Sequence, residues 1–177
     1  MDSLDTRNVL DYYKGWPTED IKEACKKDSL PYAVLMQHLT GDFNISSVWR
    51  SAYFFGAKEM FYFGGKRKID PRGGVGVKFY HDITHLRTME ELVSLKSKYS
   101  FVGLENNTER HSIDIRDFSW PNNPLILIGE ERQGLLPEVL SLCDYLIEIP
   151  NFSSMRSINA ACAASIACMD FVNKWSR

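Results

Sequence analysis

The chain has 177 residues, 44% of them hydrophobic and 25% charged, which is the composition of one ordinary globular domain and argues against a second. Its formal net charge of -2 gives no overall attraction to nucleic acid, although a local basic patch can still bind phosphate groups. No apolar run approaches the roughly 20 residues that cross a bilayer, and the first residues lack the basic and apolar regions of a signal peptide, so we expect a cytoplasmic protein.

The first half of the chain predicts a short helical extension, then a strand, a helix and a second strand. Residues 1–30 contain a helix start, and the apolar run that follows Pro31 has the length of a strand. Residues 45–56 carry apolar side chains at helical spacing, and residues 59–64 form the next strand candidate. The glycine-rich and basic segment 64–76 predicts a mobile loop.

The second half continues the alternation of strands and helices. A capping box that begins at Thr88 predicts a short helix, and residues 100–105 form a third strand candidate. Residues 125–129 and 145–150 are apolar strands, and each is followed by a polar turn. This alternation predicts an α/β fold with a mainly parallel sheet flanked by helices, formed by residues 31–177.

The last helix is expected to begin near Ser157 and to run to the end of the chain. Its apolar side chains lie near one stripe, formed by Ile158, Cys162, Ile166 (or Ser165), Met169 and Val172. We expect that stripe to pack on the sheet.

Three polar turns are the predicted walls of a ligand pocket. They lie at residues 41–44, 129–134 and 150–157, and in parallel sheets ligands bind beyond the carboxyl ends of the strands. Glycines at 129 and 134 would let the backbone approach a ligand closely. This pattern predicts a pocket but does not name its substrate.

Several well-known sites are absent from the sequence. No GxGxxG dinucleotide motif, P-loop or GxSxG nucleophile motif is present. The histidines at 38, 81, 85 and 111 show no metal-ligand spacing. The four cysteines, at 25, 143, 162 and 168, form no CxxC pair, so we expect free thiols and no metal.

Three segments resemble, in the same order, the three motifs of the SpoU (TrmH) family of RNA ribose 2'-O-methyltransferases, in the SPOUT class. The first runs from Asn44 to Gly56, and the second, LILIGEERQGL, is similar to the family's strand and its G-x-E-x-x-G-L turn. The third, IPNFSSMRSIN, is similar to the family's IP followed by a serine and an asparagine at the head of the last helix. Asn151 and Ser153 depart from the pattern, because many members have Met and Gly there; the compact length resembles the small members that lack an added RNA-binding domain.

The resemblance implies a fold and a reaction that spacing alone does not. It implies an α/β-knot with a deep C-terminal trefoil knot, S-adenosylmethionine as methyl donor, and transfer to a ribose 2'-hydroxyl in tRNA or rRNA. It also implies a homodimer whose active site is shared across the interface. Neither a metal nor a membrane is required.

The residues that the resemblance makes catalytic are Arg50, Asn44, Glu131, Ser157 and Asn159. A guanidinium stays protonated at neutral pH, so we expect Arg50 to stabilise developing negative charge rather than to abstract a proton. Other roles remain open. Arg50 and Glu131 could be ordinary surface charges, and Asn44, Ser157 and Asn159 could cap helices.

Two further groups of residues are expected to bind ligands. The cofactor site implied by the resemblance consists of Leu104, Gly129, Gly134, Ile149, Ser157 and Ile158. The predicted RNA-binding residues are Lys66, Arg67, Lys68, Arg72 and Arg156, because clustered cations bind phosphate groups independently of sequence. A charged surface loop without RNA contacts is the open alternative for the segment from Lys66 to Arg72.

Two other functions are compatible with the same fold. One is a catalytically silent RNA-binding dimer, against which the intact motif residues argue. The other is a base methyltransferase of the SPOUT class, which the ribose-directed motifs disfavour.

Overall fold

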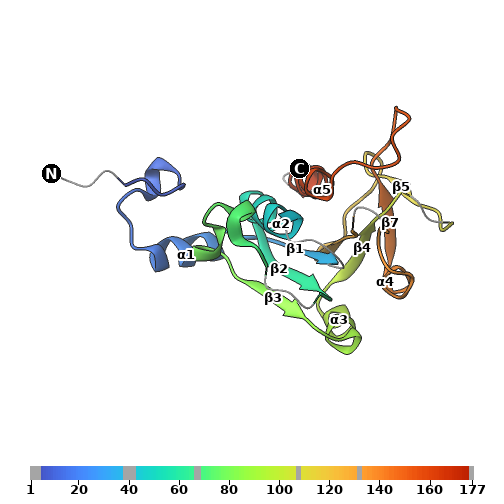
Figure 1. The fold of residues 1–177 in the computed structure, drawn as a ribbon, viewed down its shortest axis with the longest axis horizontal. Helices are drawn as coiled ribbons and strands as arrows, with labels where there is room; N and C mark the ends of the chain where they lie inside the picture. The colour runs from blue at the N-terminus through green and yellow to red at the C-terminus, as the bar shows by residue number, and fades with distance from the viewer. Residues whose placement is uncertain (1–4, 38–42, 66–68, 107–108, 131–132, 176–177) are drawn as a thin grey trace.

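A parallel sheet runs through the protein and carries helices on both of its faces (Figure 1). The computed structural model describes residues 5–37, 43–65, 69–106, 109–130 and 133–175. Within these ranges the strands are β1 (Leu30–Gln37), β2 (Ala57–Phe63), β3 (Ile83–Leu86), β4 (Ser100–Leu104), β5 (Ile113–Asp114), β6 (Pro124–Ile128) and β7 (Tyr145–Glu148). The helices are α1 (Thr18–Lys27), α2 (Phe43–Phe54), α3 (Met89–Ser94), α4 (Pro137–Leu142) and α5 (Ala160–Trp175). Short 3-10 turns are η1 (Asp11–Tyr13), η2 (Pro71–Gly74), η3 (Val77–Phe79) and η4 (Leu95–Ser97).

The described strands form one seven-stranded sheet in the order β3-β2-β1-β6-β4-β7-β5. Each neighbouring pair is parallel, from β2–β3 at one edge to β5–β7 at the other. This arrangement confirms the predicted α/β fold with a parallel sheet. The trefoil knot stays a prediction.

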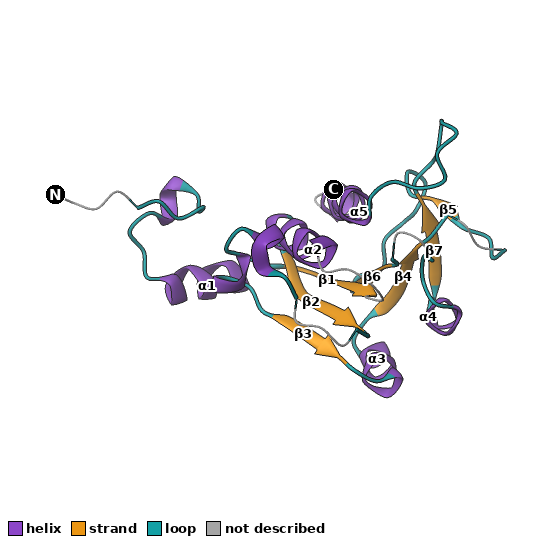
Figure 2. Cartoon of the chain, viewed as in Figure 1, coloured by secondary structure: helices purple, strands orange, loops and turns teal. Residues whose placement is uncertain are grey.

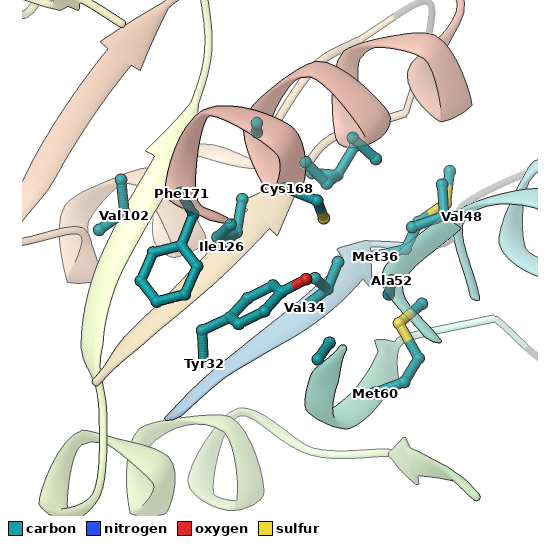
Figure 3. Close-up of a cluster of buried hydrophobic side chains, with 14 of the residues drawn as sticks. Tyr32, Val34, Met36, Val48, Ala52, Met60, Val102, Ile126, Cys168 and Phe171 are labelled. Carbon is teal, nitrogen blue, oxygen red and sulfur yellow. The ribbon is translucent and has the colours of Figure 1, made fainter. Parts of the chain in front are cut away.

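Alternate side chains of the central strands pack into two separate hydrophobic cores, one on each face of the sheet. On one face, Tyr32, Val34 and Met36 of β1 pack with buried residues of α2 and α5 (Figure 3). On the other face, Ala33 and Leu35 pack with buried residues of α3 and α4 (Figure 2). Both faces are covered at the centre of the sheet, so β6 and most of β1 are continuous apolar runs, as is usual in parallel sheets.

The predicted packing of the last helix was wrong. Helix α5 begins at Ala160, three residues later than expected, and it buries Ala160, Ala164, Ala167, Cys168 and Phe171. Three members of the predicted stripe instead face outward, since Ile158, Ile166 and Met169 are 47%, 40% and 45% exposed, whereas Val172 does pack against the core. Small alanines allow α5 to lie close to α2 and β6, and the large Phe171 is buried on the same face.

Two described elements were missed by the sequence analysis. Strand β3 is short and lies at the sheet edge, so its residues show no buried apolar run. Helix α4 has six residues and begins at Pro137, and proline is favoured at the first position of a helix. The predicted loop 64–76 contains η2, and Gly76 leads directly into η3.

The N-terminal residues form a structured extension beside the amino ends of β1 and β2. The guanidinium of Arg7 is paired with Asp5 and donates to the carbonyl of Trp16 at 2.9 Å. Lys22 of α1 forms an ion pair with Asp82 at 2.8 Å, which ties the extension to the segment before β3. Figure 1 shows the extension at the opposite end of the molecule from the loop between β7 and α5.

Candidate active site

A pocket of about 360 Å³ opens at the carboxyl ends of β4, β6 and β7. Its walls come from residues that directly follow these strands and from the start of α5. All six residues predicted to hold a cofactor line it, namely Leu104, Gly129, Gly134, Ile149, Ser157 and Ile158. The topology therefore brings together residues that are up to 54 positions apart in the chain (158 minus 104).

The turn after β6 is closed by its own backbone. The amide of Glu130 donates to the carbonyl of Gly134 at 3.1 Å, and the amide of Gly134 donates to the carbonyl of Glu130 at 2.8 Å. Gly134 has a φ of +67°, which favours glycine. A Cβ at Gly129 would lie 2.7 Å from the Cα of Gly134 and closer still to the neighbouring backbone atoms, so both glycines are required by the shape of this turn.

Two polar residues that the sequence analysis did not select hold the next part of the same wall. The fully buried side chain of Gln37 donates to the carbonyl of Gly134 at 3.0 Å and accepts from the amide of Leu136 at 2.8 Å. The carboxylate of Glu105 accepts from the amide of Leu135 at 3.0 Å and also lines the pocket. The signal in the sequence was a polar residue at the end of each apolar strand.

The loop between β7 and α5 is folded by its own polar side chains. The Oδ1 of Asn151 accepts from the amide of Ser153 at 2.8 Å, and Asn151 Nδ2 donates to the carbonyl of Met155. The amide of Met155 donates to Ser153 Oγ at 3.2 Å. Asn151 and Ser153 are the two residues that depart from the SpoU motif. They form hydrogen bonds with each other and shape the outer wall of the pocket.

Asn44 and Asn159, two of the predicted catalytic residues, lie in contact. Asn159 Nδ2 donates to Asn44 Oδ1 at 3.1 Å. Asn159 also caps α5, because its Oδ1 accepts from the amides of Ala161 at 2.8 Å and Cys162 at 3.4 Å. Asn44 lies within the first turn of α2 rather than before it. This contact joins the start of α2 to the start of α5 beside Ser157.

Arg50 is not brought to this pocket. It is exposed on α2 and is not among the described residues that line the pocket. It lies six residues after Asn44, about 9 Å along the helix axis. Arg50 instead lines a second pocket beside the N-terminal extension.

Two of the predicted RNA-binding residues, Arg72 and Arg156, are described by the structure, and they lie in different parts of the surface. Arg72 is exposed and paired with Asp70, and Arg156 lies exposed at the rim of the first pocket. Lys66, Arg67 and Lys68 lie outside the described residues, as does the predicted catalytic residue Glu131.

The described residues contain neither a metal-binding cluster nor a membrane-spanning helix. In those ranges, no cluster of three or more His, Cys, Asp or Glu side chains could hold a metal ion. Likewise, no helix there combines the length and the apolar character needed to cross a membrane.

Comparison with known proteins defines first the class and then the family. The fold is that of the SpoU methyltransferases: the SpoU methyltransferase AviRb from Streptomyces viridochromogenes, solved in complex with the cofactor AdoMet, superposes with a TM-score of 0.74 at 29% identity over 81% of this chain and 57% of that one. The model of the SpoU rRNA methylase family matches residues 31–169. The chain belongs to this family.

Curated relatives carry names that agree with the family. A 23S rRNA (uridine(2479)-2'-O)-methyltransferase of Streptomyces viridochromogenes is 28% identical over 89% of this chain and 58% of its own length. A tRNA (guanosine(18)-2'-O)-methyltransferase of Aquifex aeolicus is 22% identical over 82% of this chain and 71% of its own length. The chain thus spans little more than half of the length of the Streptomyces enzyme.

Proposed function

We propose that this protein transfers the methyl group of S-adenosylmethionine to the 2'-hydroxyl of a ribose in tRNA or rRNA. The observation that carries this proposal is the pocket at the carboxyl ends of β4, β6 and β7, which all six expected cofactor-binding residues line. The names of the two relatives, both RNA 2'-O-methyltransferases, and the cofactor in the related solved structure support it.

The pocket fits the cofactor in size and in wall chemistry. Its volume of about 360 Å³ lies within the range of small-molecule sites. Leu104, Ile149 and Ile158 would enclose the adenine, and the bare backbone at Gly129 would lie against it. The carboxylate of Glu105 would accept hydrogen bonds from ribose hydroxyls. When bound, S-adenosylmethionine supplies a methyl group activated by its sulfonium, and the protein's task is mainly to align the acceptor oxygen.

We propose further that the active unit is a homodimer in which Arg50 of one subunit faces the cofactor pocket of the other. The absence of Arg50 from the described lining of its own pocket supports a site that a second subunit completes. The outward apolar stripe of α5, with Ile166 and Met169, offers a surface that a second copy would cover. Helix α2, which carries Arg50, packs beside α5: Ser165 Oγ donates to Ser51 Oγ at 2.8 Å.

Arg50 would act by electrostatic stabilisation. Its guanidinium stays protonated, so it can hold a phosphate and stabilise the charge that develops on the ribose oxygen as the hydroxyl proton is lost. Comparable oxyanion donors contribute on the order of 100-fold to 1000-fold in rate. The joined side chains of Asn44 and Asn159 would fix the starts of α2 and α5 around the substrate, together with Ser157. Glu131 would orient Arg50 or the ribose hydroxyl.

The positively charged residues would bind the RNA backbone. Of the two that the structure describes, Arg156 at the pocket rim is the better placed, because a phosphate there would lie beside the acceptor ribose. We propose the same role for Lys66, Arg67, Lys68 and Arg72. For Arg72 to bind RNA, a phosphate would have to compete with Asp70 for the guanidinium. The side chain of Arg72 is exposed in this ion pair, so a phosphate could reach it.

Calorimetry with S-adenosylmethionine and a methyl-transfer assay on total RNA from cells that lack the gene test this function together. The wild type should bind the cofactor and label the RNA, and the label should lie in 2'-O-methyl nucleosides. Arg50→Ala should keep cofactor binding but lose methyl transfer, whereas Arg87→Ala, which changes an exposed arginine outside both pockets, should keep both. A wild type that binds RNA but neither binds the cofactor nor labels RNA would identify the silent RNA-binding dimer instead.

A further inference from the structure

A second pocket, of about 850 Å³, lies between the N-terminal extension and the end of α2. We call it the N-terminal pocket. Its apolar and aromatic walls are formed by Leu10, Tyr13, Ile21, Tyr53, Phe54, Val75, Val77 and Tyr80. Arg50 also lines this pocket, and the roles proposed above use none of its other residues.

The wall supplied by the extension is preformed. Tyr13 packs edge-on against Trp16 with ring centroids 5.4 Å apart. The amide of Gly15 donates to the Asp5 carboxylate at 3.0 Å, and the Arg7 guanidinium spans from Asp5 to Trp16. These contacts hold Tyr13 against the pocket without help from a ligand.

The opposite wall carries a fixed imidazole. Trp49 Nε1 donates to His81 Nδ1 at 3.0 Å, so Nδ1 must be unprotonated and the ring proton lies on Nε2, which faces the carbonyl of Lys58 at 3.4 Å. The ring of Tyr53 stacks on His81 with centroids 5.2 Å apart and an interplanar angle of 29°. Phe54, next along α2, is 80% exposed at the pocket mouth. Tyr53, Phe54 and His81 therefore line the same pocket as Arg50.

We infer that the N-terminal pocket binds the unstacked base of the nucleotide whose ribose is methylated. This inference rests on the proposed function, because it is the position of Arg50 at the ribose and phosphate that places the base of the same nucleotide within reach of this pocket. Single-stranded bases are recognised by stacking on aromatic side chains, and enzymes that act on one nucleotide take its base out of the helix. The exposed Lys26 and Lys58 at the rim are suited to neighbouring phosphates.

In the proposed dimer the two pockets would form one cleft. The cofactor pocket of one subunit and the N-terminal pocket of its partner would meet at the partner's Arg50. The sugar would lie at the junction, the methyl donor on one side and the base on the other. A single chain cannot arrange this, because the extension and the β7–α5 loop lie at opposite ends of the molecule (Figure 1).

Binding of two short RNAs tests the inference. One probe is a uridine oligomer of about ten nucleotides, and the other is an abasic ribose-phosphate oligomer of the same length. Stacking of a base on an aromatic side chain contributes on the order of 10-fold to 100-fold in affinity, so the wild type should prefer the uridine oligomer by that factor. Phe54→Ala should lose most of this preference, and Phe79→Ala, an exposed phenylalanine outside the pocket lining, should keep it. The salt dependence of binding should be equal in all three proteins, because the phosphate contacts are unchanged.

Three results would overturn the inference. The first is a wild type that binds both oligomers equally, and the second is a Phe54→Ala protein with the same preference as Phe79→Ala. The third is loss of the dimer in Phe54→Ala by analytical ultracentrifugation, which would assign this surface to a second copy of the chain. Calorimetry with S-adenosylmethionine on the same proteins reports separately on the proposed function, since Phe54 does not line the cofactor pocket.

Discussion

Replacing Gly129 with alanine should damage the cofactor pocket without unfolding the protein. The added Cβ would lie 2.7 Å from the Cα of Gly134, whereas carbon atoms in ordinary contact are roughly 3.5–4.0 Å apart. The carbonyl carbon of Gly134 and the amide nitrogen of Leu135 would lie closer still, so the two segments must separate by more than about 1 Å, and these overlaps are with backbone that no rotamer change can relieve.

The separation breaks the turn's internal hydrogen bonds. The reciprocal backbone bonds between Glu130 and Gly134, 3.1 and 2.8 Å long, contribute about 0.5–1.5 kcal/mol each, so the turn loses about 1–3 kcal/mol. If that loss appears in cofactor binding, the affinity falls by roughly 10-fold to 100-fold.

Calorimetry with S-adenosylmethionine and denaturant unfolding measure the two parts of this effect. Gly15→Ala is the control, because Gly15 has a φ of +80° but no atom within 4 Å of an added Cβ. It should lose about 1 kcal/mol of stability through backbone strain and keep wild-type cofactor affinity. Wild-type cofactor affinity in Gly129→Ala would refute the assignment of this turn to the pocket wall.

Three other substitutions probe the supports of the fold and the site. Gln37→Met should cost about 1–3 kcal/mol and weaken cofactor binding, because the carbonyl of Gly134 and the amide of Leu136 lose their partner; unchanged unfolding and calorimetry would contradict this. Thr88→Ala removes the capping box of α3 and should cost about 1 kcal/mol in urea unfolding while leaving cofactor affinity unchanged, whereas a loss of affinity would show that this cap reaches the pocket. Burial lowers the pKa of His81 below 6.5, so the folded state binds fewer protons than the unfolded state, and stability falls as the pH drops below about 6.5. Of the charged groups beside this ring, Asp82 raises its pKa and Lys22 lowers it. His81→Gln should lose this part of the pH dependence of unfolding, and an unchanged pH profile would show that His81 does not cause it.

Much of the fold followed from the sequence because buried parallel strands are continuous apolar runs. The strands around Leu35, Val102 and Ile126 stood out for that reason, and parallel topology then brought the predicted pocket residues together. The packing face of α5 did not follow from the sequence. Its buried face consists mainly of small residues such as Ala164, whereas Ile166 and Met169 point outward, and a rule that ranks positions by hydrophobicity selects the wrong face.

The candidate site was only partly visible in the sequence, for two physical reasons. Gln37 and Glu105 act through backbone groups that are distant in the chain, so no local motif identifies them. Whether Arg50 lies near its own cofactor pocket depends on how α2 is oriented on the sheet. The spacing of residues along one helix does not reveal that orientation.

In the proposed dimer, Arg50 acts on the cofactor pocket of the other subunit. A mixed dimer tests it directly, with one subunit carrying Arg50→Ala and the other carrying Gly129→Ala, at a cofactor concentration too low to occupy the altered pocket. The first subunit then keeps an intact pocket and the second keeps Arg50, so one of the two shared sites is complete. The mixed dimer should show about half of the wild-type methyl transfer, while each altered homodimer should be inactive. A mixed dimer as inactive as both homodimers would show that Arg50 acts within its own subunit, and the shared site would be contradicted.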